Sequence, residues 1–151
     1  MKKIICTLAL GFIVLSCSKD EDSATVVATW DRNQYGTIAS DGTVSNLTDY
    51  IHSCPSEKDN FSFTTNGVFE DEELYDSTLE AAKTQLPSCS SDKENGTYAL
   101  NGSTLTLTYT NEGAYDVVYE VVSLTETELK LKKPTSVKSR LVANYYTFTR
   151  R

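Results

Sequence analysis

The side chains that could carry out catalysis or hold a metal ion are few in this chain of 151 residues. It contains a single histidine, His52, and four cysteines. A Ser–His–Asp triad needs a histidine positioned as a base, and a zinc site needs three or four ligands at recognisable spacing. Because His52 lies in a loop rich in Ser, Pro and Cys, we expect it to be an ordinary loop residue. We therefore expect no metal, no other cofactor and no enzymatic activity.

A run of four carboxylates, from Glu70 to Glu73, is the other feature with potential chemistry. A calcium loop of the EF-hand type alternates its oxygen ligands and places a glycine at its centre, and this run does neither. We therefore expect Glu70 to Glu73 to form an exposed strand end in which like charges repel one another. No glycine-rich loop of the kind that holds phosphate groups accompanies it.

The first seventeen residues have the pattern of a secretion signal. Two lysines precede the apolar run Ile4 to Leu15, which is too short to span a bilayer as a helix. The run ends in Val14-Leu15-Ser16-Cys17, which resembles a bacterial lipobox, where a small residue precedes a cysteine that is lipidated and becomes the new N-terminus. An ordinary signal peptide cut near Ser16 is the alternative, but the charged start, the length of the run and the Ser-Cys junction together favour lipidation of Cys17.

The residues after Cys17 suggest where an anchored protein would reside. Ser18-Lys19-Asp20-Glu21-Asp22 resembles the surface-export signal of Bacteroidota lipoproteins, although a short charge run can also be a solvated linker. We expect a lipid-anchored protein of the outer membrane, exposed at the cell surface, with the periplasmic face as the alternative. The chain then divides into a signal peptide (1–16), a lipidated cysteine with an acidic linker (17–24) and one domain (25–151).

Two cysteines remain once Cys6 leaves with the signal peptide and Cys17 carries the lipid. Cys54 and Cys89 would then form an even pair in an oxidising compartment, which favours a disulfide. The bond would close a loop of roughly 35 residues and stabilise the fold by about 3–4 kcal/mol in the chain-entropy description. Metal binding by the pair is the weaker alternative, since His52 is the one nearby histidine.

From residue 25 onward the chain repeatedly alternates apolar and polar residues with a period of two, which predicts β-strands. Asn-Gly dipeptides, which favour tight hairpin turns, occur at 66–67, 95–96 and 101–102. About eight strands are expected, around residues 26–30, 61–64, 68–69, 97–100, 104–109, 115–124, 129–131 and 141–149.

Two segments interrupt this pattern. Ser77 to Glu80 forms a capping box, an apolar stripe follows at helical spacing, and Pro87 ends it, which predicts one short helix packed as a lid. Residues 33–58 are rich in Ser, Asp, Asn, Gly and Thr and are expected to form a long connection. The fold class expected is therefore all-β, an eight-stranded antiparallel up-and-down β-barrel with one short helix, because closure removes the unpaired sheet edges.

The order of the motifs adds to this expectation. The first strand contains Trp30, and Cys54 then precedes the Phe-x-Phe strand of Phe61 and Phe63. Cys89 precedes the Gly-Thr-Tyr strand Gly96–Tyr98. Two Leu-x-Leu strands follow, Leu105 with Leu107 and Leu129 with Leu131, and the segment Val-Val-Ser-Leu-Thr (Val121–Thr125) lies between them. Residues 25–150 thereby resemble the lipocalin-like domain of small Bacteroidota lipoproteins, although Ala-Thr-Trp stands where lipocalins typically have Gly-x-Trp. The resemblance implies a lipocalin-like barrel.

Aromatic residues on the predicted strands are the candidates for a ligand pocket. Those whose strands should direct them inward are Trp30, Phe61, Phe63, Tyr98, Tyr109, Tyr115 and Tyr119. They could line a pocket in the barrel mouth, or they could simply fill the interior, since eight strands leave just enough room for side chains. For any single residue of this set the packed core is the stronger expectation.

The net charge and the composition limit the classes of binding partner that we expect. Removal of the signal lysines changes the formal net charge from −7 to −9, which argues against nucleic acid. We expect a monomer that binds a small hydrophobic or amphipathic ligand. The alternative is a protein-interaction module resembling the lipid-anchored inhibitors that bacteria direct at lysozyme, since an acidic protein suits a basic target. An enzyme is the weakest of the three hypotheses.

Overall fold

The computed structural model describes residues 24–54, 57–76, 89–111, 113–134 and 142–151. These residues form one antiparallel β-sheet of nine strands and, within the described ranges, no helix. The strands are β1 (Thr29–Ala39), β2 (Val44–Asp49), β3 (Asn60–Phe63), β4 (Val68–Asp76), β5 (Cys89–Asn101), β6 (Thr104–Tyr109), β7 (Tyr115–Leu124), β8 (Glu128–Lys133) and β9 (Val142–Arg150).

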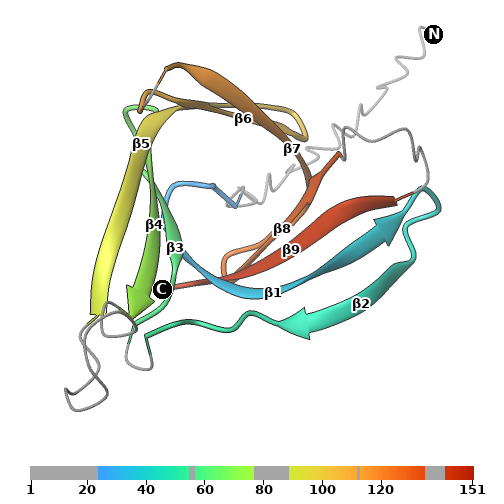
Figure 1. Cartoon of the computed structure of the whole chain (residues 1–151). Coiled ribbons are helices and arrows are strands. Elements are labelled where there is room, and N and C mark those ends of the chain that lie inside the picture. Colours follow the sequence, from blue (N-terminus) through green and yellow to red (C-terminus); the bar gives the residue numbers. More distant parts are fainter. Residues whose placement is uncertain (1–23, 55–56, 77–88, 112, 135–141) are drawn as a thin grey trace, which may run out of the picture.

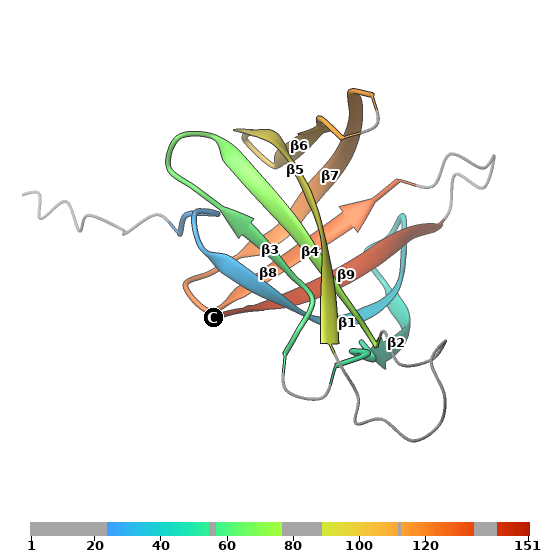
Figure 2. The same ribbon diagram turned by 60° about the vertical axis from the view of Figure 1, so that its left-hand side comes forward.

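Pairing between the first and the last strand closes the sheet into a barrel. Neighbouring strands follow the order β1-β3-β4-β5-β6-β7-β8-β9, and β9 pairs back onto β1. That pairing runs from Trp30 opposite Arg150 to Ala39 opposite Val142, with one bulge between Arg32 and Gln34. Figure 1 looks into the resulting ring of strands, and Figure 2 shows the strands crossing obliquely around it. The predicted eight-stranded antiparallel barrel is therefore confirmed.

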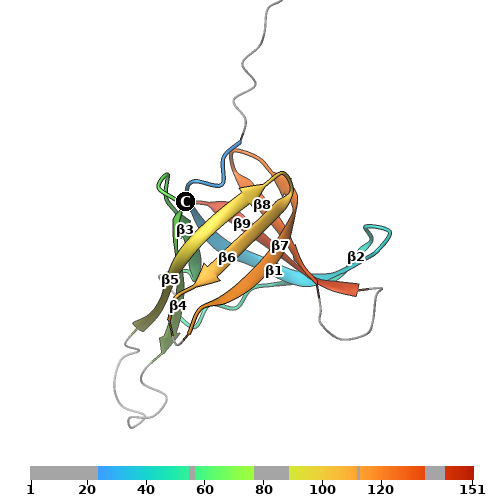
Figure 3. The ribbon, with the colours of Figure 1, turned by 90° about the horizontal axis from the view of Figure 1, so that it is seen from above.

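Strand β2 is a ninth strand outside the ring, and it corrects the expectation of a long connection over residues 33–58. The first half of β1 pairs with β3, whereas its second half pairs with β2 on the same side. The β1–β2 hairpin extends away from the barrel (Figure 3). All six residues of β2 are exposed, so neither face carries the apolar alternation by which strands are recognised in a sequence.

Two of the three Asn-Gly dipeptides make the predicted hairpin turns, and the third does not. Gly67 and Gly102 have positive φ angles of 80° and 60°, which glycine adopts without strain. Gly96 instead lies inside β5, opposite Tyr109 of β6. A Cβ atom there would lie 2.0 Å from the carbonyl oxygen of Thr108 and 2.6 Å from the ring of Phe69. Glycine at position 96 therefore permits close packing within the sheet.

One end of the barrel is densely packed. Trp30 is fully buried and donates a hydrogen bond from Nε1 to the carbonyl oxygen of Val26 at 2.7 Å. Trp30 belongs to an apolar cluster that extends from this end along the barrel and also contains Phe61, Phe63, Phe69, Leu105, Leu107, Tyr109, Tyr119, Leu129, Leu131 and Phe148. Burial of these side chains supplies the main favourable term for folding.

Several predictions fall on residues outside the described ranges. These are the signal peptide, Cys17 and most of the acidic linker, all within 1–23, and the helix predicted between Ser77 and Pro87. The described residues include no helix long and apolar enough to cross a membrane.

Candidate functional site

A cavity of about 280 Å³ lies at the other end of the barrel. Tyr109 ends β6, Tyr115 begins β7 and Lys133 ends β8, so the cavity is at the mouth and not at the packed end. Its walls are mostly aromatic and include a few charged side chains: Arg32, Tyr50, Phe61, Asp71, Glu73, Tyr109, Tyr115, Val117, Tyr119, Lys133, Tyr146 and Phe148.

The alternation of side chains along each strand explains which residues face the cavity. On β7, Tyr115, Val117 and Tyr119 all line it, whereas Val118 between them is exposed. The same rule applies to β9, where Tyr146 and Phe148 point inward. Strands β7 and β9 therefore each contribute lining residues two positions apart.

The aromatic rings contact one another in favourable geometries. The rings of Tyr109 and Tyr115 stack with centroids 4.8 Å apart and planes at 3°. Tyr119 and Tyr146 meet edge to face at 6.3 Å, and Phe61 packs against Phe148 at 5.4 Å. Such pairs contribute about 0.5–1.5 kcal/mol each beyond the area they bury, which stabilises this arrangement of the walls.

A buried ion pair lies in the wall of the cavity. Arg32 Nη2 donates to Asp71 Oδ1 at 2.7 Å, and the two side chains are 15% and 11% exposed. Arg32 Nη1 donates to Glu73 Oε1 at 2.9 Å and to the Tyr50 hydroxyl at 3.3 Å. The second oxygen of Asp71 accepts a hydrogen bond of 2.9 Å from the Tyr109 hydroxyl. The pair is thus hydrogen-bonded on both sides, as a charge removed from water requires.

Burial changes the titration of these groups. It raises the pKa of Asp71 to about 6, although Arg32 and the Tyr109 hydroxyl both lower it, and two neighbouring carboxylates raise it further. Burial also raises the pKa values of Tyr109 and Tyr119 above the ordinary value for tyrosine. Both hydroxyls therefore remain protonated at neutral pH, while Asp71 is ionised at pH 7 and titrates near pH 6.

The acidic side of the mouth continues from β4 onto β5. Asp71 and Glu73 lie directly opposite Glu94 and Asp92 in the antiparallel register. The four carboxylates line a second hollow of about 160 Å³ beside the cavity. Like charges placed directly opposite each other destabilise a pair of strands, so this arrangement is unfavourable for folding alone.

Comparison with known proteins identifies the fold family. The model of the lipocalin-like domain matches residues 18–131. The chain belongs to the lipocalin-like family. The crystal structure of a lipocalin-like protein from Bacteroides uniformis is similar to this domain, with a TM-score of 0.52 at 15% identity over 83% of this chain and 97% of that one. A protein from Bacteroides eggerthii has a TM-score of 0.50 at 15% identity over 83% and 98%. No match to a curated protein was found.

Four of the seven aromatic residues predicted from the sequence line the cavity of this lipocalin-like domain, namely Phe61, Tyr109, Tyr115 and Tyr119. Trp30 and Phe63 belong to the packed core away from the cavity walls. Tyr98 packs against that core and donates a hydrogen bond from its hydroxyl to the carbonyl oxygen of Thr64 at 2.7 Å. The interior is therefore filled at one end and hollow at the other, and ligand contact by the four lining residues stays a prediction.

The charged residues of the cavity were missed by the sequence analysis, and the carboxylate run was interpreted wrongly. Asp71 is 8% exposed and lies in the middle of β4, not at an exposed strand end. A usable signal was present, because Arg32 follows Trp30 by two positions and Asp71 follows Phe69 by two. Residues at that spacing share a face of a strand, so both charges had to point into the barrel.

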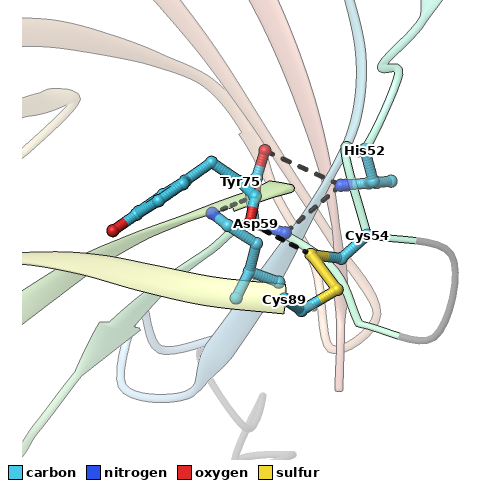
Figure 4. The surroundings of a disulfide bond; sticks show 6 residues. His52, Cys54, Asp59, Tyr75 and Cys89 are labelled. Atoms are coloured by element: carbon cyan, nitrogen blue, oxygen red, sulfur yellow. Dashed lines mark hydrogen bonds and ion pairs between the residues drawn. A yellow bond between two sulfur atoms is a disulfide. The ribbon is translucent and has the colours of Figure 1, made fainter. Parts of the chain in front are cut away.

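The predicted disulfide is confirmed: Cys54 is bonded to Cys89, with their Cα atoms 5.8 Å apart (Figure 4). It ties the segment before β3 to the start of β5. His52 lies beside it and accepts a hydrogen bond at Nδ1 from the backbone N–H of Asp59 at 3.2 Å. Asp59 Oδ1 in turn accepts from the backbone N–H of Leu74 at 2.7 Å. Within the described residues, no group of three or more potential ligands is arranged to hold a metal ion.

Proposed function

We propose that this protein is a lipid-anchored binding protein of the outer membrane, which takes up a small, largely apolar molecule through the open end of its barrel. The observation that carries the proposal is the cavity of about 280 Å³ with aromatic walls. Lipocalin-like domains are typically binding modules and not enzymes, and the family assignment supports the same reading. We further propose that it acts as a monomer.

The size and the lining of the cavity indicate the kind of ligand. Pockets for small molecules usually span about 300–1,000 Å³ and combine apolar walls with a few fixed polar groups. At about 280 Å³ this cavity lies just below that range, so its ligand is compact. The rings of Phe61, Tyr119, Tyr146 and Phe148 would contact the apolar body, and the Arg32–Asp71 pair would meet a polar group.

The envelope location rests on the sequence. The apolar run ending in Ser16-Cys17 supports lipidation, and the charged residues that follow support display at the cell surface. Several acyl chains on Cys17 would hold an otherwise water-soluble barrel at the membrane, because stable anchoring takes more than one chain.

An interaction with a basic protein such as lysozyme was the alternative. The net charge favours this alternative through electrostatic steering. A hollow lined by aromatic rings, however, would not contribute to the binding of a protein surface. The cavity therefore favours a small ligand. A lysozyme pull-down at low and high salt separates the two, because salt-sensitive capture would support the alternative.

Two valines at adjacent positions of β7 allow a matched test. Val117 lines the cavity and Val118 is exposed on the outer face, so Val117→Phe fills the hollow whereas Val118→Phe adds the same ring to the surface. Binding of N-phenyl-1-naphthylamine, an uncharged apolar dye, is followed by its fluorescence. We expect Val117→Phe to weaken binding by about tenfold, since forcing a ring into occupied space costs about 1–3 kcal/mol, and Val118→Phe to bind like the wild type.

Equal binding by both variants, or no binding by the wild-type protein, would contradict the proposal. Trp30 fluorescence and circular dichroism verify that each variant is folded. Native mass spectrometry of protein purified from its own host then identifies the molecule that occupies the wild-type cavity.

A further inference from the structure

We propose that the ligand of this cavity is a cation, a small organic amine whose apolar body lies between the aromatic rings and whose ammonium group meets the carboxylates of β4 and β5. The inference rests on the proposed function, since it names the ligand class of the same cavity.

Charge around the mouth is unevenly distributed. Asp71, Glu73, Asp92 and Glu94 lie on adjoining strands. One facing cation, Arg32, donates to both Asp71 and Glu73, so its charge is already matched by two carboxylates. An anionic ligand would have to compete with them for the guanidinium group.

The two carboxylates of β5 have no cationic partner among the residues that the structure describes. No lysine, arginine or histidine nitrogen in those ranges forms an ion pair with Asp92 or Glu94. The Tyr115 hydroxyl approaches Glu94 Oε2 at 3.4 Å, which is a weak contact. Since Asp92 and Glu94 face Glu73 and Asp71 across the strands, an ammonium group between them would relieve the repulsion of both like-charged pairs.

A hydroxyl in the cavity wall points independently to a bound molecule. Tyr119 is 8% exposed and lines the cavity, and no hydrogen bond joins its hydroxyl to another described residue. Among the described residues, Thr147 Oγ1 is the one fully buried side-chain atom without a partner, so the Tyr119 hydroxyl is reached from the space of the cavity. Polar groups in such a place are hydrogen-bonded to water or to a ligand. A tyrosine hydroxyl both donates and accepts, so it can accept a hydrogen bond from an ammonium group or donate to a hydroxyl of the same ligand.

The faces of the aromatic rings already receive cations in this structure. The guanidinium carbon of Arg32 lies 5.2 Å from the ring centroid of Phe61, and Nζ of Lys133 lies 5.8 Å from that of Tyr119. Cations within about 6 Å of a ring centroid are attracted by its negative face. A cationic ligand would use the same property of the walls, and Lys133, the second cation of the lining, is the group it would have to avoid.

Three probes with the same ring and nearly the same length separate charge from shape: 2-phenylethylamine, 2-phenylethanol and 3-phenylpropionate. Their dissociation constants are measured by NMR titration at pH 7.4, at low ionic strength and in 0.5 M NaCl. We expect the amine to bind about tenfold more tightly than the alcohol and the carboxylate to bind most weakly, with the preference for the amine reduced in high salt.

Neutralising the carboxylates of β5 tests the assignment by residue. Asp92→Asn with Glu94→Gln should weaken amine binding about fivefold and leave alcohol binding unchanged, since each exposed charge pair contributes modestly. Glu70→Gln with Glu126→Gln removes the same two charges away from the mouth and should change neither. Lys133→Gln should not weaken amine binding.

The outcomes separate the inference from the proposed function. Equal binding of the three probes, or tighter binding of the carboxylate that Lys133→Gln abolishes, would overturn the cationic ligand while keeping a binding cavity. If the three probes and N-phenyl-1-naphthylamine all fail to bind, the proposed function fails as well.

Discussion

Replacing Arg32 by methionine should destabilise the barrel in a way that depends on pH. The substitution keeps a long apolar side chain but removes the cation that lies 2.7 Å from Asp71 Oδ1 and 2.9 Å from Glu73 Oε1. Asp71 then remains buried without its cation, whereas Glu73, with a side chain 64% exposed, stays solvated. The consequence of the change is therefore concentrated on Asp71.

The magnitude follows from the burial of Asp71. Its pKa in the folded protein is about 6 against a usual value of 3.8, so ionising it at pH 7 disfavours the folded state by roughly 3 kcal/mol even with Arg32 present. Removing one partner of a buried ion pair costs about 3–5 kcal/mol. Because the Tyr109 hydroxyl still donates to Asp71, we expect about 3 kcal/mol at pH 7.5, the lower end of that range.

The sign of the pH dependence is set by the raised pKa. The contribution of Asp71 to stability is fully present below its unfolded-state pKa near 4 and is lost as the pH rises through 6. Without Arg32 the folded-state pKa of Asp71 is higher still, so the variant goes on losing stability above pH 6. The difference between wild type and variant should therefore shrink to about 1 kcal/mol at pH 5.0, where Asp71 is protonated in both.

Urea unfolding at pH 5.0 and 7.5 measures these differences, with fluorescence of the single tryptophan as the signal because Trp30 is fully buried. Arg32→Met combined with Asp71→Leu is the control. It replaces the pair by apolar groups and should lie within about 1 kcal/mol of the wild type at both pH values. A destabilisation by Arg32→Met that is the same at the two pH values would show that the ionisation of Asp71 is not the cause of the loss.

Three further changes have definite expected outcomes. Gly96→Ala should destabilise the fold by about 3 kcal/mol in urea unfolding, because its Cβ would overlap the Thr108 carbonyl oxygen. Gly42 lies in open space at φ +87°, so Gly42→Ala should lower the stability by about 1 kcal/mol. Equal losses in the two variants would contradict this. Replacing Cys54 and Cys89 by serine should lower the free energy of unfolding by about 3–4 kcal/mol. A thiol reductant should cause the same loss of stability in the wild-type protein and should not change the stability of the variant. Cys17→Ala should abolish labelling with an alkyne fatty acid and release the protein from the membrane fraction; a variant that remains membrane-bound would refute the lipid anchor.

Much of the barrel could be predicted because its strands obey a local rule. In β6, Leu105, Leu107 and Tyr109 alternate with threonines, and Gly102 makes the turn before it. Strand β2 was not predicted because it is exposed on both faces, so its residues do not alternate between apolar and polar. The Asn95-Gly96 dipeptide predicts a turn, but the role of Gly96 depends on Phe69 and Thr108, which approach it from two other strands.

The cavity likewise combines a feature that the sequence predicts with one that it does not. Alternation along β7 places Tyr115, Val117 and Tyr119 on one face, but it does not say whether that face is packed or hollow. At the closed end the facing side chains, such as Trp30 and Phe69, fill the interior completely. At the mouth the same alternation leaves space.

The number of barrel strands, the inward face of most of them and the pairing of Cys54 with Cys89 can all be inferred from the order of the residues. These features depend on local periodicity and on the count of cysteines. The contact of Arg32 with Asp71, 39 residues away in the sequence, the grouping of the four carboxylates and the open end of the interior become visible only in the folded barrel. Closure of the sheet brings these side chains together through strand register and barrel radius, and the residues near any one position do not specify either quantity.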